Sequence, residues 1–526
     1  MSSGWEYRNQ KFSPQLLKHL KGSFAENYKA TISSAGAATF VKCYSGEGLV
    51  TEKTFFQFDI DVRRALKIIA ASAPLDFIVC TKSDNNYFHL CFIMATLLSG
   101  RRLCLLNPSD SPEKKKKKIN LLKEKNYIVE VRSLDENDAV EAEIPASCNI
   151  FEDFIYIFTS GTTGESKIVR QTQAGALANL DALVEHHDLG GGGRVIATPL
   201  PVFHVNALHF SFFGSFFSRS KLILFQKFDP ILLIKSIKED KVEIVSVVPH
   251  ILATLLKFQE KIQRLKPYEL KYFVSAASGL PVSIFNAWIG LGYKIIQGYG
   301  MSEGINFSLK TPINIPIGHL KKISEGSERA SVGLPVYGNE VRIFDEADVA
   351  IEGDEIIGQI GIKGWNLMPG YKNIGEVELN SSGFFKTGDL GFTRTFEGQR
   401  FFFIGARIKE IAKPMGVMVA LPSLDEKIKQ IIGNSVELMT FSIDDNNGER
   451  IGLVLVDPFS TEKAIDVSIL LKQNLLSHES PAIIICTGRV IRSESGKLIR
   501  GLASKLISES QSQTIEGISW HFPKLN

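Results

Sequence analysis

Short runs of apolar residues alternate with amphipathic stretches along the first part of the chain. Five of these runs have the length of strands and lie at residues 77–80, 101–106, 154–158, 221–225 and 242–248. Several of them are apolar at nearly every position, which is typical of strands covered on both faces of a parallel sheet. The stretch 172–187 spaces its leucines as one helix face requires, and Thr172 suits a helix N-cap. The pattern therefore predicts α/β layers.

The pattern changes after about residue 330, where short β-rich segments are separated by glycine. These segments lie at residues 341–345, 359–364 and 400–405, and we expect a β-rich subdomain there. From Lys409 onward an α+β pattern predicts helices near 424–432 and 464–475 and strands at 451–456 and 482–486. We therefore expect an N-terminal domain at 1–408 and a smaller C-terminal domain at 409–526.

Composition excludes several classes of protein. The 526 residues exceed the roughly 250–300 residues at which a single core stops growing. With 44% hydrophobic and 22% charged residues, the chain is an ordinary globular protein and extended disorder is excluded. A net charge of +3 is too small for the phosphate-neutralising field of a nucleic-acid binder. We therefore expect no nucleic-acid partner.

Cysteine usage and apolar run length indicate the compartment. The six cysteines are widely spaced and form no CxxC pair, which is typical of a reducing compartment. The first residues lack the pattern of a signal peptide, and no apolar stretch reaches the ~20 residues that span a bilayer. We expect a cytoplasmic protein without a membrane span.

Two clusters of like residues allow more than one interpretation. The run Lys114–Lys118 begins a helix-like stretch after Pro112, and such a run is either a solvated helix face or a patch that attracts phosphate. His186 and His187 are adjacent, so one helix face cannot direct both rings to one metal ion. The sequence therefore predicts no structural zinc site.

The segment that carries chemistry lies at residues 159–167 and reads TSGTTGESK. Gly161 and Gly164 permit tight turns and close approach of the backbone to a ligand, and Lys167 adds a cation. Hydroxyl donors come from Ser160, Thr162 and Thr163. This composition suits a polyphosphate, although the spacing is not that of a Walker A loop and a Ser/Thr/Gly loop alone is equally typical of a surface turn.

This segment resembles the phosphate-binding motif TSGTTGxPK of the adenylate-forming enzymes, which include acyl-CoA synthetases, stand-alone adenylation enzymes and luciferases. Ser166 stands where the family has proline, and Ile168 where glycine often follows the lysine. Four more segments resemble family motifs in the family's order, at residues 297–303, 386–389, 407–416 and 495–497. The resemblance covers nearly the whole chain. It implies a large N-terminal domain of α/β subdomains with a β-rich subdomain, followed by a small mobile α+β C-terminal domain.

The reaction that the resemblance implies explains the kinds of residue present. Activation of a carboxylate by ATP brings an anion to a polyphosphate, so the transition state needs cations and oriented donors more than a protein nucleophile. Glu303 offers carboxylate oxygen to Mg²⁺, with Thr163 nearby, and its alternative is a surface acid after a turn. By resemblance, Lys497 swings onto the reacting carboxylate and the α-phosphate, so the catalytic set is Lys497, Lys167, Glu303 and Thr163.

The resemblance also assigns the contacts to ATP. Tyr299 would stack on adenine, Ser302 would keep a hydroxyl at the α-phosphate, and Asp389 would accept from the ribose hydroxyls, whereas an isolated Asp in a loop is more often a cap or turn former. The full set is Thr159, Ser160, Gly161, Thr162, Thr163, Gly164, Lys167, Gly298, Tyr299, Gly300, Ser302, Asp389, Arg407 and Lys497. In the hinge motif, Ala406 replaces the usual glycine before Arg407, and Lys409 would be the pivot between two domain orientations.

The acid pocket carries the weakest pattern. Residues 199–204 resemble the family's PxFH segment, so His204 is either a gate to the pocket or a buried, hydrogen-bonded core histidine. By resemblance, residues 275–279 line the pocket and contribute Ala277, Ser278 and Gly279. Enzymes that activate amino acids place an Asp beside the aromatic residue of this segment, whereas this chain has Phe203 and His204. An α-amino acid substrate is therefore disfavoured.

Three functions follow as hypotheses. The first is an acyl- or aryl-CoA ligase that uses ATP and Mg²⁺ to activate a small carboxylic acid and then transfers it to CoA. The second is a stand-alone adenylation enzyme that loads the phosphopantetheine thiol of a separate carrier protein, because no carrier domain is evident after Lys497. The third is a catalytically silent homologue. Five residues present together argue against it, namely Lys167, Glu303, Asp389, Arg407 and Lys497.

Overall fold

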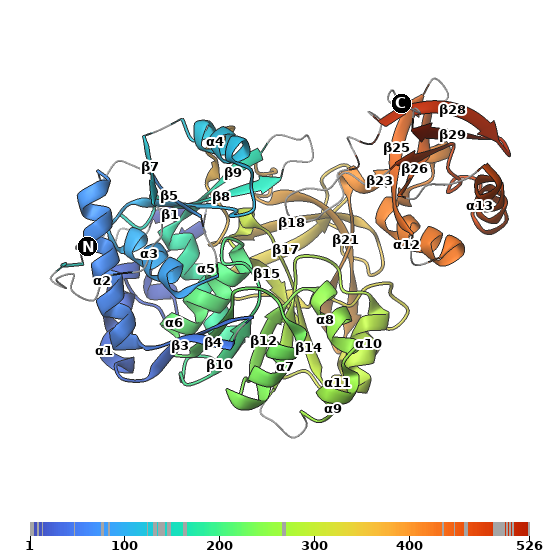
Figure 1. Ribbon diagram of the computed structural model, residues 1–526. Helices are drawn as coiled ribbons and strands as arrows, with labels where there is room; N and C mark the ends of the chain where they lie inside the picture. The colour runs from blue at the N-terminus through green and yellow to red at the C-terminus, as the bar shows by residue number, and fades with distance from the viewer. Residues whose placement is uncertain are drawn as a thin grey trace. The chain divides into compact units, whose positions relative to one another are not determined.

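The computed structural model describes residues 5–7, 10–12, 14–46, 48–74, 78–82, 85–123, 125–129, 134, 142–144, 149–160, 166–265, 270–433, 436–445, 448–456, 461–487, 500, 503, 506–507 and 510–523. The chain forms two compact units (Figure 1). The larger unit comprises Met1–Thr159, Ser166–Thr387 and Phe392–Ile404. The smaller unit comprises Ser160–Glu165, Gly388–Gly391 and Gly405–Asn526.

A nine-stranded sheet forms the centre of the larger unit, in the order β16-β15-β14-β13-β12-β10-β11-β3-β4. The strands are β3 (Thr39–Ser45), β4 (Gly48–Thr54), β10 (Val195–Thr198), β11 (Lys221–Phe225), β12 (Ile244–Val247), β13 (Tyr272–Ser275), β14 (Lys294–Gly300), β15 (Phe307–Lys310) and β16 (Leu334–Pro335). The run from β3 through β11, β10, β12 and β13 to β14 is parallel, and β4 and β15 pair antiparallel at its two ends. Every residue of β12 is buried, as the unbroken apolar run at 242–248 predicts. Every residue of β13 is also buried, although no run was predicted there.

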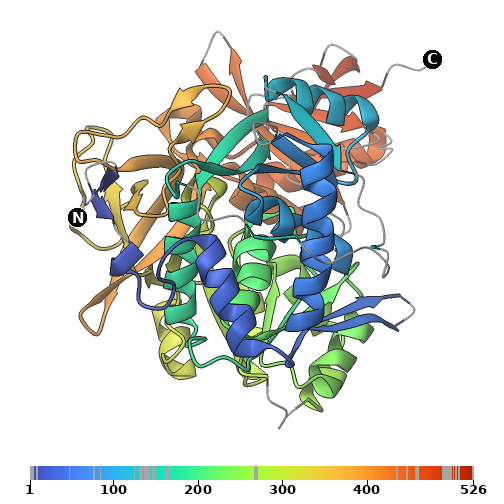
Figure 2. The ribbon, with the colours of Figure 1, turned by 90° about the vertical axis from the view of Figure 1, so that its left-hand side faces the viewer.

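Helices cover both faces of this sheet. Neighbouring residues of β13 show the two faces, because Tyr272 stacks on His187, which follows α5, whereas Phe273 packs on Trp288 of α10. Helix α5 begins where the sequence predicts, with the Thr172 hydroxyl accepting from the amide of Gly175. Helices α1 and α2 contact each other and are seen from a second side in Figure 2. The helices of this unit are α1 (Phe24–Ala35), α2 (Phe55–Ser72), α3 (Tyr87–Leu98), α4 (Pro112–Leu121), α5 (Gln173–His186), α6 (Gly214–Phe217), α7 (Pro230–Glu239), α8 (Pro249–Leu256), α9 (Gln259–Gln263), α10 (Val282–Gly290), α11 (Ile317–Ile323), the π-helix η2 (Asn206–Phe213) and the short 3-10 helices η1 (Pro14–Leu16) and η3 (Ser302–Gly304).

A seven-stranded sheet contains the two strands that flank the predicted phosphate loop. Its order is β20-β19-β9-β8-β6-β5-β7, with β5 (Ile78–Lys82), β6 (Arg102–Leu106), β7 (Asn126–Val129), β8 (Asp153–Ser160), β9 (Ser166–Thr172), β19 (Gly370–Tyr371) and β20 (Gly375–Glu376). Strand β8 ends at Ser160 and β9 begins at Ser166, so the loop predicted at 159–167 connects two neighbouring strands of this sheet.

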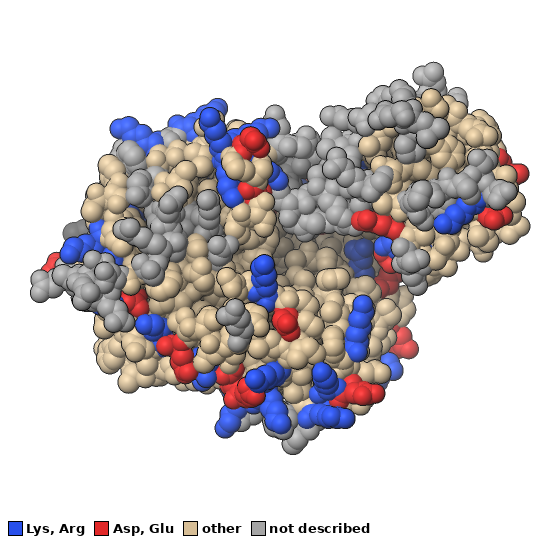
Figure 3. Space-filling model, viewed as in Figure 1, with Lys and Arg blue, Asp and Glu red and all other residues tan. Residues whose placement is uncertain are grey.

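The lysine run lies on α4 and only part of it is a solvated face. Lys and Arg side chains gather over α4 (Figure 3), and Lys116 and Lys117 are exposed. Lys118 differs, because it is buried and its Nζ lies 2.7 Å from a carboxylate oxygen of the buried Asp110. The prediction of a solvated face is therefore wrong at Lys118, where an ion pair with Asp110 accounts for the burial.

A four-stranded sheet follows where the β-rich pattern predicts it. Its order is β17-β18-β21-β22, with β17 (Asn339–Phe344), β18 (Gly358–Gly364), β21 (Phe385–Phe396) and β22 (Gln399–Arg407). These strands contain the predicted segments 341–345, 359–364 and 400–405 except for residue 345 at the end of the first.

The smaller unit has a sheet and a core of its own. The sheet order is β25-β26-β27-β29-β28, with β25 (Glu437–Asp445), β26 (Gly448–Val456), β27 (Ile483–Thr487), β28 (Ser510–Ile515) and β29 (Ile518–Pro523), together with a short pair, β23 (Ile411–Ala412) and β24 (Val419–Ala420). Its helices are α12 (Leu421–Ile432), α13 (Thr461–Asn474) and the 3-10 turns η4 (Ile408–Glu410) and η5 (Pro414–Gly416). The fully buried Trp520 donates to the Ser468 hydroxyl on α13 at 2.9 Å. The α+β pattern is confirmed here, and with it the α/β class of the whole chain.

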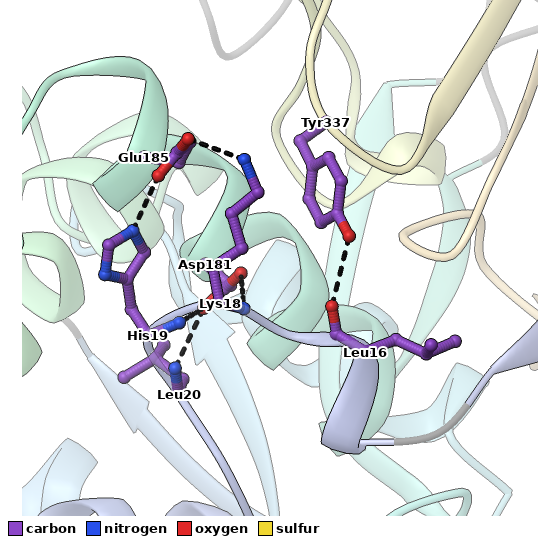
Figure 4. Close-up of polar contacts among 7 residues, drawn as sticks. All are labelled: Leu16, Lys18, His19, Leu20, Asp181, Glu185 and Tyr337. Atoms are coloured by element: carbon purple, nitrogen blue, oxygen red, sulfur yellow. Dashed lines mark hydrogen bonds and ion pairs between the residues drawn. The ribbon is translucent and has the colours of Figure 1, made fainter.

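The described part of the N-terminal segment is held to α5 by one buried carboxylate. Asp181 accepts from the backbone amides of Lys18, His19 and Leu20 at 2.6–2.8 Å (Figure 4). Consecutive amides that converge on one oxyanion stabilise its charge without a cation. In the same close-up, the Tyr337 hydroxyl donates to a backbone carbonyl of this segment at 3.1 Å.

Two further observations concern the described residues alone. Cys43, Cys80, Cys91, Cys104 and Cys486 are all buried free thiols. Within these parts of the chain, none of the helices combines the length and the apolar character that crossing a membrane requires.

Candidate active site

The structure describes only the two ends of the predicted phosphate loop. Thr159 lies half-buried at the end of β8, Ser160 is the last residue of that strand, and Lys167 lies half-buried near the start of β9. Gly161, Thr162, Thr163 and Gly164 lie outside the described residues, as does Lys497. Their assignment to ATP and to catalysis therefore stays a prediction.

Lys167 and Glu303 meet on the two sides of one tyrosine. The Lys167 ammonium lies 4.7 Å from the centroid of the Tyr371 ring, a cation–π distance. The Tyr371 hydroxyl donates to Glu303 Oε1 at 3.0 Å. Burial, followed by the nearby Glu303 carboxylate, raises the pKa of Tyr371, so the phenol keeps its proton and remains a donor. A cation and a carboxylate predicted from separate motifs are thus brought together by a residue that the sequence analysis did not name.

The two departures from the phosphate motif fall on a short stretch held by Asn373. The Asn373 side chain accepts from the amide of Ile168 at 3.0 Å and donates to the carbonyl of Ser166 at 3.0 Å. The amide of Lys372 donates to the carbonyl of Ile168 at 2.8 Å. These bonds fix the backbone on both sides of Lys167, so neither the family's proline nor its glycine is needed to define the strand here.

Glu303 lies on η3 and its backbone is held from a distant segment. The residue is 8% exposed, and its carbonyl accepts from the amide of Met368 at 2.7 Å. The preceding carbonyl, that of Ser302, accepts from the Gln171 side chain at 3.0 Å, and Gln171 in turn contacts His209 Nε2 at 2.9 Å. Gln171 and His209 thus hold the backbone next to Glu303, and no sequence motif marked them.

The turn after Glu303 is strained in a way that fixes the motif at 297–303. Ile305, a buried β-branched residue, has φ of 64°, and the amide of Asn306 donates to the carbonyl of Gly304 at 2.7 Å. A Cβ at Gly300 would lie 1.6 Å from the carbonyl oxygen of Asn306, so only glycine fits there. Strain of this kind costs of order 1–3 kcal/mol and is concentrated at functional sites.

Asp389 and Arg407 of the smaller unit form an ion pair. Arg407 Nε lies 3.0 Å from Asp389 Oδ1, and the side chains are 42% and 7% exposed, respectively. A largely buried carboxylate thus orients a half-exposed guanidinium, and both residues carry ribose or phosphate contacts in the sequence prediction. Ala406 does not adopt a left-handed backbone, so its Cβ is compatible with the position where the family has glycine. Lys409 is exposed on η4.

The acid-pocket segments lie at the ends of elements of the nine-stranded sheet. His204 is exposed just before the π-helix η2, so its interpretation as a buried core histidine is wrong. The buried histidine of this segment is His209, one turn further on, whose pKa burial lowers to about 3. Ala277 and Ser278 are exposed in the loop after β13, and Ala277 has φ of 73°.

Two glycines of the predicted site lie so close to neighbouring side chains that a Cβ would clash with them. A Cβ at Gly279 would lie 2.4 Å from the Arg329 side chain, and a Cβ at Gly298 would lie 2.6 Å from the ring of Phe307. Tyr299 and Ser302 are half-buried around Gly300 on the same hairpin. The absence of side chains at these glycines lets neighbouring residues approach the backbone.

Comparison with known proteins places this geometry in a family. Residues 98–372 match the family described as AMP-binding enzyme. The chain is 27% identical over 439 residues to the 2-succinylbenzoate–CoA ligase of Bacillus licheniformis, covering 78% of this chain and 85% of the relative. It is 23% identical over 484 residues to the 4-coumarate–CoA ligase-like 6 of Arabidopsis thaliana, covering 84% and 83%.

Solved structures share the fold. ATP-bound MatB from Rhodopseudomonas palustris superposes with a TM-score of 0.75 at 19% identity, covering 91% of this chain and 98% of that chain. O-succinylbenzoate coenzyme A synthetase (MenE) from Bacillus subtilis, in complex with ATP and magnesium, also gives 0.75 at 21% identity, covering 91% and 99%.

The match over more than half of the chain shows that this protein belongs to the AMP-binding enzyme family, the adenylate-forming enzymes, as the motifs predict. Within that class it is an AMP-forming acid–thiol ligase.

Proposed function

We propose that the protein joins a small carboxylic acid to CoA in two steps. In the first, a carboxylate oxygen attacks the α-phosphorus of ATP, the bond to the bridging oxygen breaks, and pyrophosphate leaves with that oxygen. In the second, the CoA thiolate attacks the acyl carbon of the acyl-AMP, the bond to the AMP oxygen breaks, and AMP leaves. The relatives named as CoA ligases support CoA as the acceptor.

The observation that carries the proposal is the cluster of Lys167, Tyr371 and Glu303. Lys167 would neutralise phosphate charge that develops as pyrophosphate leaves. Glu303 presents hard carboxylate oxygen, the donor that Mg²⁺ prefers, and Tyr371 fixes one of its oxygens by a hydrogen bond. Bound Mg²⁺ would supply further neutralisation of the polyphosphate. Thr163 is the proposed second contact to the metal.

The remaining predicted residues complete the proposed site. Asp389 would accept from the ribose hydroxyls while orienting Arg407, Tyr299 would stack on adenine, and Ser302 would donate to the α-phosphate. Lys497 would contact the reacting carboxylate, and Lys409 would be the pivot that exchanges the adenylating for the thiol-transferring orientation. His204, exposed at the start of η2, would gate the acid pocket.

The names of the relatives do not identify the acid that this protein activates, because they range over 2-succinylbenzoate, long-chain fatty acids and sulfoacetate. The test is ATP/pyrophosphate exchange across aliphatic, aromatic and dicarboxylic acids, followed by thioester formation with CoA. We expect exchange that depends on the acid and on Mg²⁺, and a CoA thioester as product. If none of the acids supports ATP/pyrophosphate exchange, the adenylation step is refuted. Transfer to a purified phosphopantetheine carrier but not to CoA would replace CoA by the carrier.

A further inference from the structure

Lys310 is a lysine whose charge the described part of the protein does not compensate. It is the last residue of β15, it is 0% exposed, and its Nζ has no hydrogen-bond partner among the described residues. Burial lowers its pKa well below the ordinary value. A lysine buried in this way is destabilising in the absence of an acceptor, so a core position would normally hold an apolar residue.

The position of Lys310 is next to the proposed site. In the β14–β15 hairpin Lys310 pairs with Gly298, directly before Tyr299 of the proposed ATP site. A Cβ at Gly298 would lie 3.3 Å from Lys310 Cγ, so the absent side chain gives the lysine stem its space. Lys310 therefore lies directly opposite Gly298, a residue of the segment that we assign to nucleotide binding.

The amine is surrounded by aromatic rings and by two histidines whose hydrogen bonds are made to other groups. Its Nζ lies 3.8 Å from the centroid of Phe307 and 4.7 Å from that of Phe210, distances at which a ring face stabilises a cation. His186 Nε2 contacts the carbonyl of Thr311, and His187 Nδ1 contacts the Tyr272 hydroxyl. Among the described residues no carboxylate forms an ion pair with Lys310.

A second irregularity lies over the same place. Phe210 belongs to η2, which has π-helical hydrogen bonding over Asn206–Phe213 and starts two residues after the exposed His204. π-helical turns are rare and occur mostly at functional sites. The segment that would gate the acid pocket thus leads, within two turns, to a ring that contacts the Lys310 amine.

From this juxtaposition we propose that Lys310 determines specificity for the far end of the acid and that the substrate is a dicarboxylic acid whose second carboxylate binds the Lys310 ammonium. One carboxylate would be activated at the α-phosphate, and the other would bind the Lys310 amine beside Phe210 and Phe307. This inference rests on the proposed adenylation of a carboxylic acid and adds the substrate class. The second carboxylate supplies the anion that the described residues around Lys310 lack.

The test uses the full chain and Lys310→Met, which keeps the length of the side chain and removes the amine. The control is Lys294→Met on β14, because Lys294 is a partly buried lysine of the same hairpin that donates to the carbonyl of Ile313 at 2.7 Å. The probes are aliphatic and aromatic dicarboxylic acids, the monomethyl ester of each, and monocarboxylic acids of equal length. ATP/pyrophosphate exchange gives kcat/KM for each combination of enzyme variant and acid.

We expect the wild-type enzyme to prefer a dicarboxylic acid over its monomethyl ester. Lys310→Met should lower kcat/KM for the dicarboxylic acid about 30-fold or more while leaving that for the ester within a few fold. Lys294→Met should leave both unchanged. If only monocarboxylic acids support exchange, the inference is overturned and the proposed function stands. If none of the acids supports exchange, the proposed function itself is refuted.

Proton uptake distinguishes binding at Lys310 from a merely structural role. An anion bound beside the amine raises its pKa, so binding should take up protons, which calorimetry detects in buffers of different ionisation heat. The charges of His186 and His187 interact with that of Lys310, Tyr272 contacts His187 Nδ1, and all three residues remain in Lys310→Met. Uptake that is larger in the wild type than in the variant supports the inference. Equal uptake with unchanged selectivity would show that Lys310 is a core residue only.

Discussion

Replacing Tyr371 with phenylalanine removes one oxygen atom from the candidate site and leaves the ring next to Lys167. The lost bond is the one from the Tyr371 hydroxyl to Glu303 Oε1 at 3.0 Å, whereas the ring keeps the contact to the Lys167 ammonium at 4.7 Å. The change therefore isolates the orientation of Glu303 from the position of Lys167.

The size of the effect follows from the type of bond. Hydrogen bonds to a charged group contribute about 1.5–3 kcal/mol, and each ~1.4 kcal/mol is a factor of ten in rate. If the bond acts fully in the transition state, adenylation should slow about 10- to 150-fold in Tyr371→Phe. A second variant, Tyr371→Leu, also removes the cation–π contact and should lose a further factor that corresponds to about 0.5–2 kcal/mol.

ATP/pyrophosphate exchange, measured as a function of Mg²⁺ concentration, checks both parts of this reasoning. Because Glu303 is the proposed metal ligand, Tyr371→Phe should shift the Mg²⁺ midpoint upward as well as lower the maximal rate. The matched control is Tyr337→Phe, which removes the hydroxyl that donates to the carbonyl of Leu16 at 3.1 Å. That control should leave exchange and the Mg²⁺ midpoint unchanged. An unaltered Mg²⁺ titration in Tyr371→Phe would refute the role given to this hydrogen bond.

The other predictions concern the two half-reactions, pH and the N-terminal segment. Lys497→Ala should abolish pyrophosphate exchange but keep thioester formation from supplied acyl-AMP, whereas Lys409→Pro, which restricts φ at the proposed pivot, should do the reverse; proportional loss of both steps in both variants would contradict domain alternation. Burial lowers the pKa of His209 to about 3 and that of His186 to about 4, so the folded state favours the neutral rings. The contribution of these two histidines to the free energy of unfolding should then be constant above about pH 6.5 and fall as the pH drops toward 3, by at most about 1.4 kcal/mol per pH unit for each histidine. A denaturation series over this acidic range should show a smaller slope for His209→Gln. Asp181→Ala should lower the thermal midpoint because three backbone amides lose their acceptor, and an unchanged midpoint with unchanged proteolysis of the N-terminal segment would contradict that role.

Local patterns predict most of the larger unit because its strands are buried on both faces. The run at 221–225 coincides with β11, and the helix predicted behind Thr172 coincides with α5. Strand β28 was not predicted, since its residues Ser510–Ile515 are mostly exposed and polar and carry no apolar period. It is a strand because β29 pairs with it, which is a tertiary effect.

Some residues of the candidate site could likewise be predicted from the sequence, and others could not. Lys167, Glu303, Asp389 and Arg407 stand in motifs that a single sequence displays, so they were predicted. Tyr371 was not, because it lies 68 residues from Glu303 along the chain and its role appears only when β19 pairs with β9. The burial of Lys310, likewise, is a property of the hairpin and of the rings above it, and an isolated lysine in a sequence is ordinarily read as exposed.

The burial of the cysteines makes them reporters of opening. Four of the described free thiols lie in the larger unit and one, Cys486, lies in the smaller. Burial raises the pKa of Cys43 to about 12, so in the native protein it is both shielded and in the unreactive thiol form. The protein would be exposed briefly to an alkylating reagent at increasing denaturant concentrations, and the separate cysteine peptides would be measured by mass spectrometry. The native cysteines would therefore report the denaturant concentration at which each unit unfolds. Modification of the Cys486 peptide before the Cys43 peptide would show that the smaller unit opens first.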